Sequence, residues 1–174
     1  AVFLIALTGC GSGSDNITNE QISLQLQEDT SIQQSINFSD TPIVLTAVSN
    51  GNLAVSTLGI TYTPNANFNG NDSATVEAGT TRYAFSFSIS AVNDSPTLQQ
   101  TSLKVTAADE ISGQLIADDI DGDTVTFALT EAPENGALTL TSDGSFTYLP
   151  SELELPNTSF NVTLSDAQSS ADFT

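Results

Sequence analysis

The stretch that decides the fold is Ala84-Phe85-Ser86-Phe87-Ser88-Ile89, in which apolar and small polar residues alternate. Because successive side chains of a strand point to opposite faces, this pattern predicts a strand with one buried and one exposed face. The same alternation occurs in Ile22-Ser23-Leu24-Gln25-Leu26. No stretch of ten or more residues combines a helical period with helix caps. The sequence therefore predicts an all-β protein.

Turn-forming residues separate the predicted strands at short intervals. Asn, Asp and Gly favour tight turns because they accept backbone conformations that other residues avoid. Many short strands with regular turns are typical of a β-sandwich. The turn segments are Ser49-Asn50-Gly51-Asn52, Asn69-Gly70-Asn71-Asp72, Asn93-Asp94-Ser95-Pro96, Asp121-Gly122-Asp123, Glu134-Asn135-Gly136 and Ser142-Asp143-Gly144.

Part of the sequence occurs twice. Residues 59–64, Gly-Ile-Thr-Tyr-Thr-Pro, parallel residues 144–150, Gly-Ser-Phe-Thr-Tyr-Leu-Pro, and the tyrosines Tyr62 and Tyr148 are 86 positions apart. Two copies of one template predict two sandwiches in tandem, over residues 19–94 and 95–174. A Gly/Ser-rich tether over residues 11–18 precedes them. We expect the second sandwich to be truncated at its last strand, because the sequence ends at Phe173-Thr174.

These residues resemble tandem bacterial cadherin-like repeats. The resemblance is carried by Gly144-Ser145-Phe146-Thr147-Tyr148-Leu149-Pro150, by residues 62–72, by Ala91-Val92-Asn93-Asp94-Ser95-Pro96 and by residues 119–127, Asp-Ile-Asp-Gly-Asp-Thr-Val-Thr-Phe. It implies tandem Ig/cadherin-like Greek-key β-sandwiches. It also implies a structural spacer or adhesion segment of a bacterial surface protein, a class in which some members bind Ca²⁺ between domains.

The charge of the chain is strongly negative. It has 21 carboxylates against Lys104 and Arg82, for a formal net charge of −19. Such a surface repels phosphate backbones, which excludes nucleic acid as a partner. It attracts hard cations, Ca²⁺ above all, which prefer carboxylate and carbonyl oxygens. Solubility in a salty medium is an alternative explanation of the same charge.

One acidic segment is a candidate calcium site. Asp119, Asp121 and Asp123 alternate, so an extended segment turns all three to one face, and Gly122 permits a tight turn. Neighbouring carboxylates repel, and a bound cation removes that repulsion. An EF-hand does not fit, because Thr124 stands where its loop glycine belongs. The alternative is an acidic surface turn without a metal.

The cadherin-like resemblance extends the candidate set to both sides of the junction between the repeats. It implies calcium shared between the linker and acidic residues of the flanking domains. The first copy has Phe38-Ser39-Asp40-Thr41-Pro42 in place of the Asp-rich loop, so we expect any site there to be degraded. The nominated metal ligands are Asn93, Asp94, Glu110, Asp119, Asp121 and Asp123.

The first ten residues predict a lipid anchor. Residues 1–7 are too short an apolar run to span a bilayer, and they fit the end of a signal peptide. Leu7-Thr8-Gly9-Cys10 resembles the lipobox of bacterial lipoproteins, which implies diacylation of Cys10. Gly11 follows instead of the Asp associated with inner-membrane retention, which favours the outer membrane or cell surface. A chance Cys near the start of the sequence is the alternative.

Composition also bears on catalysis. The chain has no His and a single Cys, so neither a Ser-His-Asp nor a Cys-His arrangement can form. We expect no enzymatic activity; an enzyme would need a cleft with paired carboxylates. The expected partners are a membrane, through Cys10, and a cell-surface protein or glycan. The alternative function is a carbohydrate-binding accessory module of a secreted or surface hydrolase. Two or more of Tyr62, Tyr83 and Tyr148, coplanar and exposed, would favour that alternative.

Overall fold

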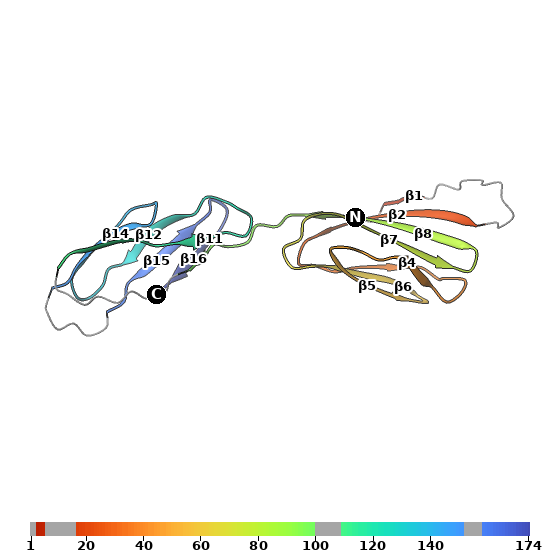
Figure 1. Cartoon of the computed structure of the whole chain (residues 1–174), viewed down its shortest axis with the longest axis horizontal. Helices are drawn as coiled ribbons and strands as arrows, with labels where there is room; N and C mark the ends of the chain where they lie inside the picture. The colour runs from red at the N-terminus through yellow and green to blue at the C-terminus, as the bar shows by residue number, and fades with distance from the viewer. Residues whose placement is uncertain (1–2, 6–16, 100–108, 152–157) are drawn as a thin grey trace. The chain divides into compact units, whose positions relative to one another are not determined.

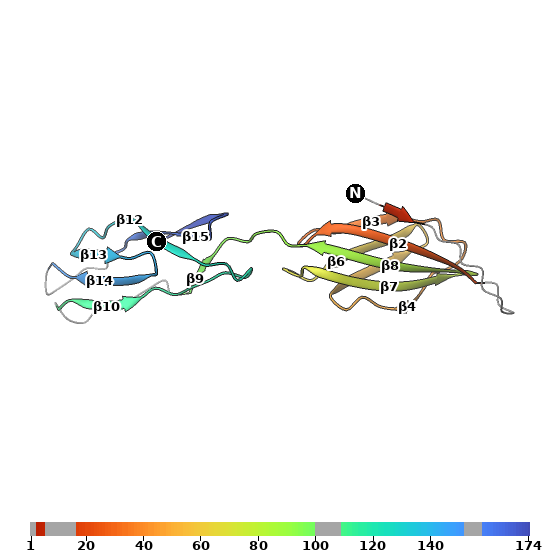
Figure 2. The same cartoon turned by 90° about the horizontal axis from the view of Figure 1, so that it is seen from above.

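A computed structural model describes residues 3–5, 17–99, 109–151 and 158–174, the first three as backbone (Figures 1 and 2). Within these ranges every regular element is a strand, which confirms the all-β prediction. No helix of the described residues is long and apolar enough to cross a membrane. The chain divides into two compact units, Ala1–Val92 and Asn93–Thr174. Each unit is described separately below.

Unit 1 is a two-layer sandwich. One sheet has the strand order β1-β2-β8-β7-β4 and the other has the order β3-β6-β5. Figure 1 shows β5 and β6 in a layer below β7 and β8. The strands are β1 (Phe3–Ile5), β2 (Thr18–Gln27), β3 (Ile32–Ser35), β4 (Ile43–Thr46), β5 (Gly51–Ser56), β6 (Gly59–Pro64), β7 (Gly70–Ala78) and β8 (Thr81–Ser90). Because the chain changes sheet after β2, β3, β4 and β6, the connectivity is of the Greek-key type.

The core of unit 1 follows the predicted alternation. In β8, Phe85, Phe87 and Ile89 are buried, whereas the residues between them are exposed. The ring of Phe87 stacks on that of Tyr62, with centroids 4.0 Å apart, so the two sheets meet through aromatic side chains. β2 runs parallel to β8, with Ile22 opposite Phe85, and adds its own buried residues to this core. Each such fully buried side chain contributes about 1.5–3 kcal/mol.

Unit 2 has the same arrangement of its main strands. One sheet has the order β10-β14-β13 and the other has the order β12-β15-β16, which match β3-β6-β5 and β4-β7-β8 of unit 1; β9 and β11 form a separate pair. Figure 2 shows β10, β14 and β13 side by side. The strands are β9 (Thr97–Leu98), β10 (Ile111–Gln114), β11 (Ala117–Asp118), β12 (Thr126–Glu131), β13 (Ala137–Leu140), β14 (Ser145–Leu149), β15 (Asn161–Ser165) and β16 (Ser170–Phe173). The prediction of Greek-key β-sandwiches is therefore confirmed.

The core of unit 2 lies between these two sheets. Phe146 of β14 packs with Phe127 of β12 and with Val162 and Leu164 of β15. At the edge of this core Tyr148 is 7% exposed, and its hydroxyl donates to the carbonyl of Asn135 at 2.5 Å. In unit 1 the hydroxyl of Tyr62 donates in the same way to the carbonyl of Asn50, at 3.4 Å.

Candidate functional site

The acidic loop after β11 is built around the side chain of Asp119. Its Oδ1 accepts hydrogen bonds from the backbone N–H groups of Asp121 (2.9 Å) and Asp123 (3.3 Å). The N–H of Gly122 donates to the carbonyl of Asp119 at 3.2 Å. Gly122 has φ +79°, a left-handed conformation that glycine accepts at little cost. The other carboxylate oxygen of Asp119, Oδ2, is buried and has no hydrogen-bond partner among the described residues.

The residues Asn93 and Asp94 lie against this loop and belong to the same unit. The N–H of Asp94 donates to Oδ2 of Asp121 at 2.8 Å. The side-chain amide of Gln168 donates to Oδ1 of Asn93 at 2.8 Å and to Oδ2 of Asp123 at 3.3 Å. Five of the six nominated ligands therefore gather at one end of unit 2.

Glu110, the sixth nominated ligand, does not join them. It is exposed and directly precedes β10, whose first residue, Ile111, pairs with Tyr148. From there β10 runs toward Ser145, the opposite end of β14, before the chain reaches Asp119. The nine residue-to-residue steps from Glu110 to Asp119 span up to about 30 Å when extended. The structure separates Glu110 from the acidic loop by the length of β10.

Sequence reasoning missed Asp166, the residue that fixes Asn93. Its carboxylate is 4% exposed and accepts from the side-chain amide of Asn93 (3.0 Å), the hydroxyl of Ser169 (2.7 Å) and the N–H groups of Gln168 (2.7 Å) and Ser169 (2.6 Å). The hydrogen bond from Asn93 and those from Ser169 hold the pKa of Asp166 far below its usual range. Asp-Ala-Gln-Ser reads locally as a turn, but no sequence signal joins it to Asn93.

Unit 1 has a buried carboxylate that was also not nominated. Glu28 is 2% exposed, and its Oε1 accepts from the N–H of Val92 at 2.6 Å. Its Oε2 has no hydrogen-bond partner within the described part of the chain. In the sequence Glu28 stands out only as half of the acidic pair Glu28-Asp29. A bound cation would satisfy a buried carboxylate oxygen of this kind.

The donor set fits the chemistry of calcium only in part. All the groups are carboxylate or amide oxygens, as a hard divalent cation prefers, and Oδ2 of Asp119 is a buried oxygen without a partner. Several of the other oxygens already accept N–H groups. In the described ranges no three His, Cys, Asp or Glu side chains are grouped so that they could hold a metal ion. Binding would require these side chains to turn from N–H donors toward the ion.

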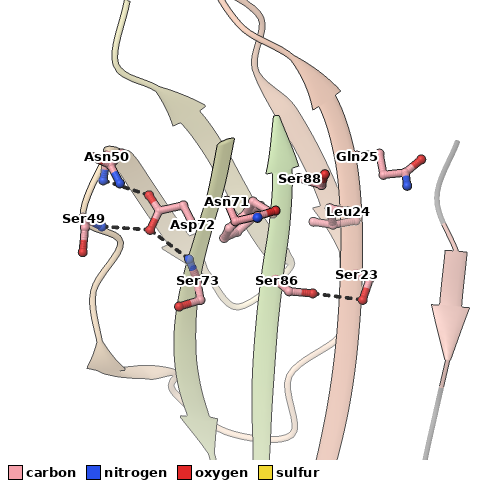
Figure 3. A pocket seen from close by; sticks show the side chains of 11 residues that line it. Ser23, Leu24, Gln25, Ser49, Asn50, Asn71, Asp72, Ser73, Ser86 and Ser88 are labelled. Atoms are coloured by element: carbon pink, nitrogen blue, oxygen red, sulfur yellow. Dashed lines mark hydrogen bonds between the residues drawn. The ribbon is translucent and has the colours of Figure 1, made fainter. Parts of the chain in front are cut away.

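A second polar region lies in unit 1, where a shallow depression is lined by β2, β7 and β8 (Figure 3). Asp72 lies at its edge and is 8% exposed. The Asp72 carboxylate accepts from the N–H groups of Ser49 (3.0 Å), Asn50 (2.8 Å) and Ser73 (2.8 Å) and from the hydroxyl of Tyr62 (3.0 Å). Asp72 is the one carboxylate among the described lining residues, so this depression does not supply a carboxylate pair.

The remaining predicted features are placed as follows. Tyr62, Tyr83 and Tyr148 are buried, with exposed fractions of 0%, 7% and 7%, so they do not form an exposed platform for sugars. Cys10 lies outside the described residues, as does most of the predicted signal segment and tether. The backbone of β1 pairs antiparallel with β2, with Leu4 opposite Ile22.

Comparison with known proteins adds a family match for the second unit. Residues 90–174 match the model of the bacterial cadherin-like domain. This confirms the cadherin-like resemblance over that range, which includes β9–β16 and the acidic loop. None of the curated proteins compared with the chain matches it.

Solved structures resemble the chain only distantly. An endo-fucoidan hydrolase from glycoside hydrolase family 107 has 16% identity and a TM-score of 0.36, with 97% of this chain and 29% of that one covered. The titin Ig tandem A164–A165 has 11% identity and a TM-score of 0.34, covering 87% and 89%. The Yersinia pseudotuberculosis adhesin InvE has 11% identity and a TM-score of 0.31, covering 86% and 55%. The chain spans about three tenths of the length of the fucoidan hydrolases, and likenesses this weak carry no argument about function.

Proposed function

We propose that the chain is a structural spacer or adhesion segment of a bacterial cell-surface lipoprotein. The observation that carries this proposal is the match of residues 90–174 to the bacterial cadherin-like domain. Two sandwiches with the same strand order support it, because each has a continuous aromatic and aliphatic core that resists deformation. The proposed partners are a membrane, through a lipid on Cys10, and a cell-surface protein or glycan.

The proposal includes calcium at the acidic end of unit 2. Asn93, Asp94, Asp119, Asp121 and Asp123 supply the oxygens, and Glu110 is too far along β10 to contribute. Calcium would neutralise carboxylates that otherwise repel one another. It would also tie the residues at the start of unit 2 to its Asp loop, which restricts local bending.

Thermal unfolding tests the calcium step. A ligand present at about ten times its Kd stabilises the native state by about 1.4 kcal/mol. For a unit of this size, that raises the Tm by about 5–10 °C. We expect this shift in the unit 2 transition on adding CaCl2 after chelation, and a smaller one with MgCl2, which prefers to keep its waters. Unfolding curves that superimpose in CaCl2 and in chelator would contradict the calcium step and leave the spacer proposal itself unchanged.

Location and anchoring are tested separately. In intact bacteria that express the protein, an external protease should remove it, and the membrane-extracted protein should carry acyl chains on Cys10 by mass spectrometry. Each buried methylene of those chains contributes about 0.8 kcal/mol of membrane affinity. Cys10→Ser should release the protein from the membrane fraction without changing its Tm. A protein that external protease never reaches would contradict the surface role.

A further inference from the structure

The chain passes through unit 1 between two neighbouring strands. β2 begins at Thr18, after the predicted anchor and tether, and β8 ends at Ser90, shortly before unit 2 begins at Asn93. The two strands lie side by side in one sheet (Figure 2) and run parallel over all ten residues of each, with Thr18 opposite Thr81. Because they are parallel, the start of β2 and the end of β8 lie at opposite ends of the pair, about 30 Å apart.

This arrangement determines how tension along the chain acts on the hydrogen bonds between the two strands. Tension pulls the start of β2 and the end of β8 in opposite directions along the strands, so it loads these bonds in shear. Bonds loaded in shear share the force and break together, whereas bonds pulled apart from one end break one after another. The hydrogen bonds of a parallel pair are evenly spaced, so the force is shared along the whole of β2 and β8.

Further hydrogen bonds extend the pair at both ends. The N–H of Thr18 donates to the carbonyl of Thr80 at 2.8 Å, and the N–H of Glu28 donates to the carbonyl of Ser90 at 3.0 Å. Beyond β8, the N–H of Val92 donates to Oε1 of the buried Glu28 carboxylate at 2.6 Å. Bonds to a charged, buried acceptor are stronger than neutral ones in water. Glu28 therefore holds the exit of the chain against the end of β2.

Side chains on both faces of the sheet also join β2 to β8. On the outer face, the hydroxyl groups of Ser23 and Ser86 are hydrogen-bonded at 2.9 Å. On the inner face, Leu24 of β2 lies opposite Phe87 of β8, and both are buried in the core. Separating the two strands would expose this apolar surface to water. The pair is therefore held by its backbone bonds, by a side-chain bond on one face and by the core on the other.

We propose that the β2–β8 pair is a force-bearing clamp, which keeps unit 1 folded while the chain is under tension between a surface anchor and a bound partner. The inference rests on the proposed spacer or adhesion role only for the origin of the tension. The clamp itself follows from the strand order and direction, and it depends neither on calcium nor on the lipid. The strands of the other sheet, β3, β6 and β5, lie outside the path of the force, so they stabilise unit 1 without resisting the pull directly.

Single-molecule force spectroscopy of the unlipidated 174-residue chain, pulled in two directions, tests the proposal. Handles on Cys10, the single cysteine, and on the exposed position of Ser95→Cys load the pair in shear. Handles on Cys10 and on Thr80→Cys pull at one end of the pair, because Thr18 bonds to Thr80, and peel β2 from β8 bond by bond. We expect the unfolding force to be at least about twofold higher in the first direction at the same pulling speed. Equal forces would overturn the proposal. Because no surface anchor is needed, a failure of the surface role is detected separately, by the protease experiment.

A matched pair of substitutions separates resistance to force from stability. Leu26 of β2 and Leu53 of β5 are both half-buried and both pack against the core of unit 1. Leu26→Ala and Leu53→Ala should each lower the Tm of unit 1, because each leaves a gap in the core. Under a constant shear force, Leu26→Ala should shorten the lifetime of the folded unit by at least about tenfold more than Leu53→Ala does, because it weakens the strand that is pulled. Equal lifetimes of the two variants would show that the whole core resists the force, and would overturn the clamp.

Discussion

Replacing Asp72 with Asn should destabilise unit 1 and leave unit 2 unchanged. Oδ1 of Asp72 accepts the N–H groups of Ser49 and Ser73, and Oδ2 accepts the N–H of Asn50 and the hydroxyl of Tyr62. An Asn side chain keeps one acceptor oxygen, so its NH2 group would face N–H or O–H donors. Charge-assisted hydrogen bonds are about twice as strong as neutral ones, and an unsatisfied buried donor costs about 1–3 kcal/mol. The expected loss is about 2–4 kcal/mol.

Calorimetry of the whole chain measures this loss, and we expect the two units to give separate transitions because each has its own core. At about 4–8 °C per kcal/mol for a unit of this size, the unit 1 transition of Asp72→Asn should fall by about 8–32 °C. The matched control is Asp40→Asn, which removes one charge from an exposed carboxylate of the same unit. Its transition should move by no more than about 3 °C, as is usual for a surface substitution.

The pH dependence of the same variant gives a sharper test. Burial raises the pKa of Asp72, but the N–H groups of Ser49, Asn50 and Ser73 and the Tyr62 hydroxyl outweigh it, so the net shift is downward. A carboxyl with a lowered pKa stabilises the folded state above its unfolded pKa, about 3.9, and loses that contribution as the pH falls through the folded value. The gap in Tm between wild type and Asp72→Asn should therefore be full at pH 7 and narrow below about pH 4. A gap that is absent at pH 7, or constant down to pH 3, would refute this reasoning.

Three further substitutions in unit 2 test its turns and its acidic end. Gly136 has φ +93°, and the Cβ of Gly136→Ala would lie 2.5 Å from a carbonyl oxygen, whereas Gly122 has φ +79° and its new Cβ would have no atom within 4 Å. Urea unfolding should therefore show a loss of about 1–2 kcal/mol for Gly122→Ala, from the backbone conformation alone. Gly136→Ala should lose about 2 kcal/mol more, because of the steric clash. Asp166→Asn should lower the Tm of unit 2 at pH 7 and speed amide hydrogen exchange at its first residues; unchanged exchange would show that other contacts hold them. Asp119→Asn should reduce the Ca²⁺-induced rise in Tm by more than half, whereas Asp143→Asn, the same change in another turn, should leave it intact.

The fold could be predicted because its signals are local. Alternation in β8 follows from a strand with one face in the core, so Phe85, Phe87 and Ile89 could be assigned to the interior from sequence alone. The 86-residue spacing identified Tyr62 and Tyr148, whose hydroxyl groups donate to the carbonyls of equivalent asparagines. An alternating pattern or a turn is encoded by a few consecutive residues, so both can be recognised without knowledge of tertiary contacts.

The candidate site could be predicted only where it is local. The turn around Asp119 is encoded within five residues, and the structure shows its hydrogen bonds. Glu110 was nominated through the cadherin-like resemblance, but its distance from the loop depends on the direction of β10. Asp166 was missed because its partner, Asn93, lies 73 positions away, at the other end of the unit in sequence. A single sequence does not contain that pairing.

The hydrogen bonds of Asn93 hold the first residue of unit 2 in place without a metal ion. Asn93 is fixed to unit 2 by Asp166, Gln168 and Ser169, and none of these three bonds uses Asp119. This connection is present without a metal, so chelation should not release it. Calcium would act instead on the acidic loop, where Oδ2 of Asp119 is buried without a described partner and like charges repel. The acidic loop and the Asn93 connection share Gln168, which donates to both Asn93 and Asp123, so the changes in stability of Asp119→Asn and Asp166→Asn should not be additive in the double variant.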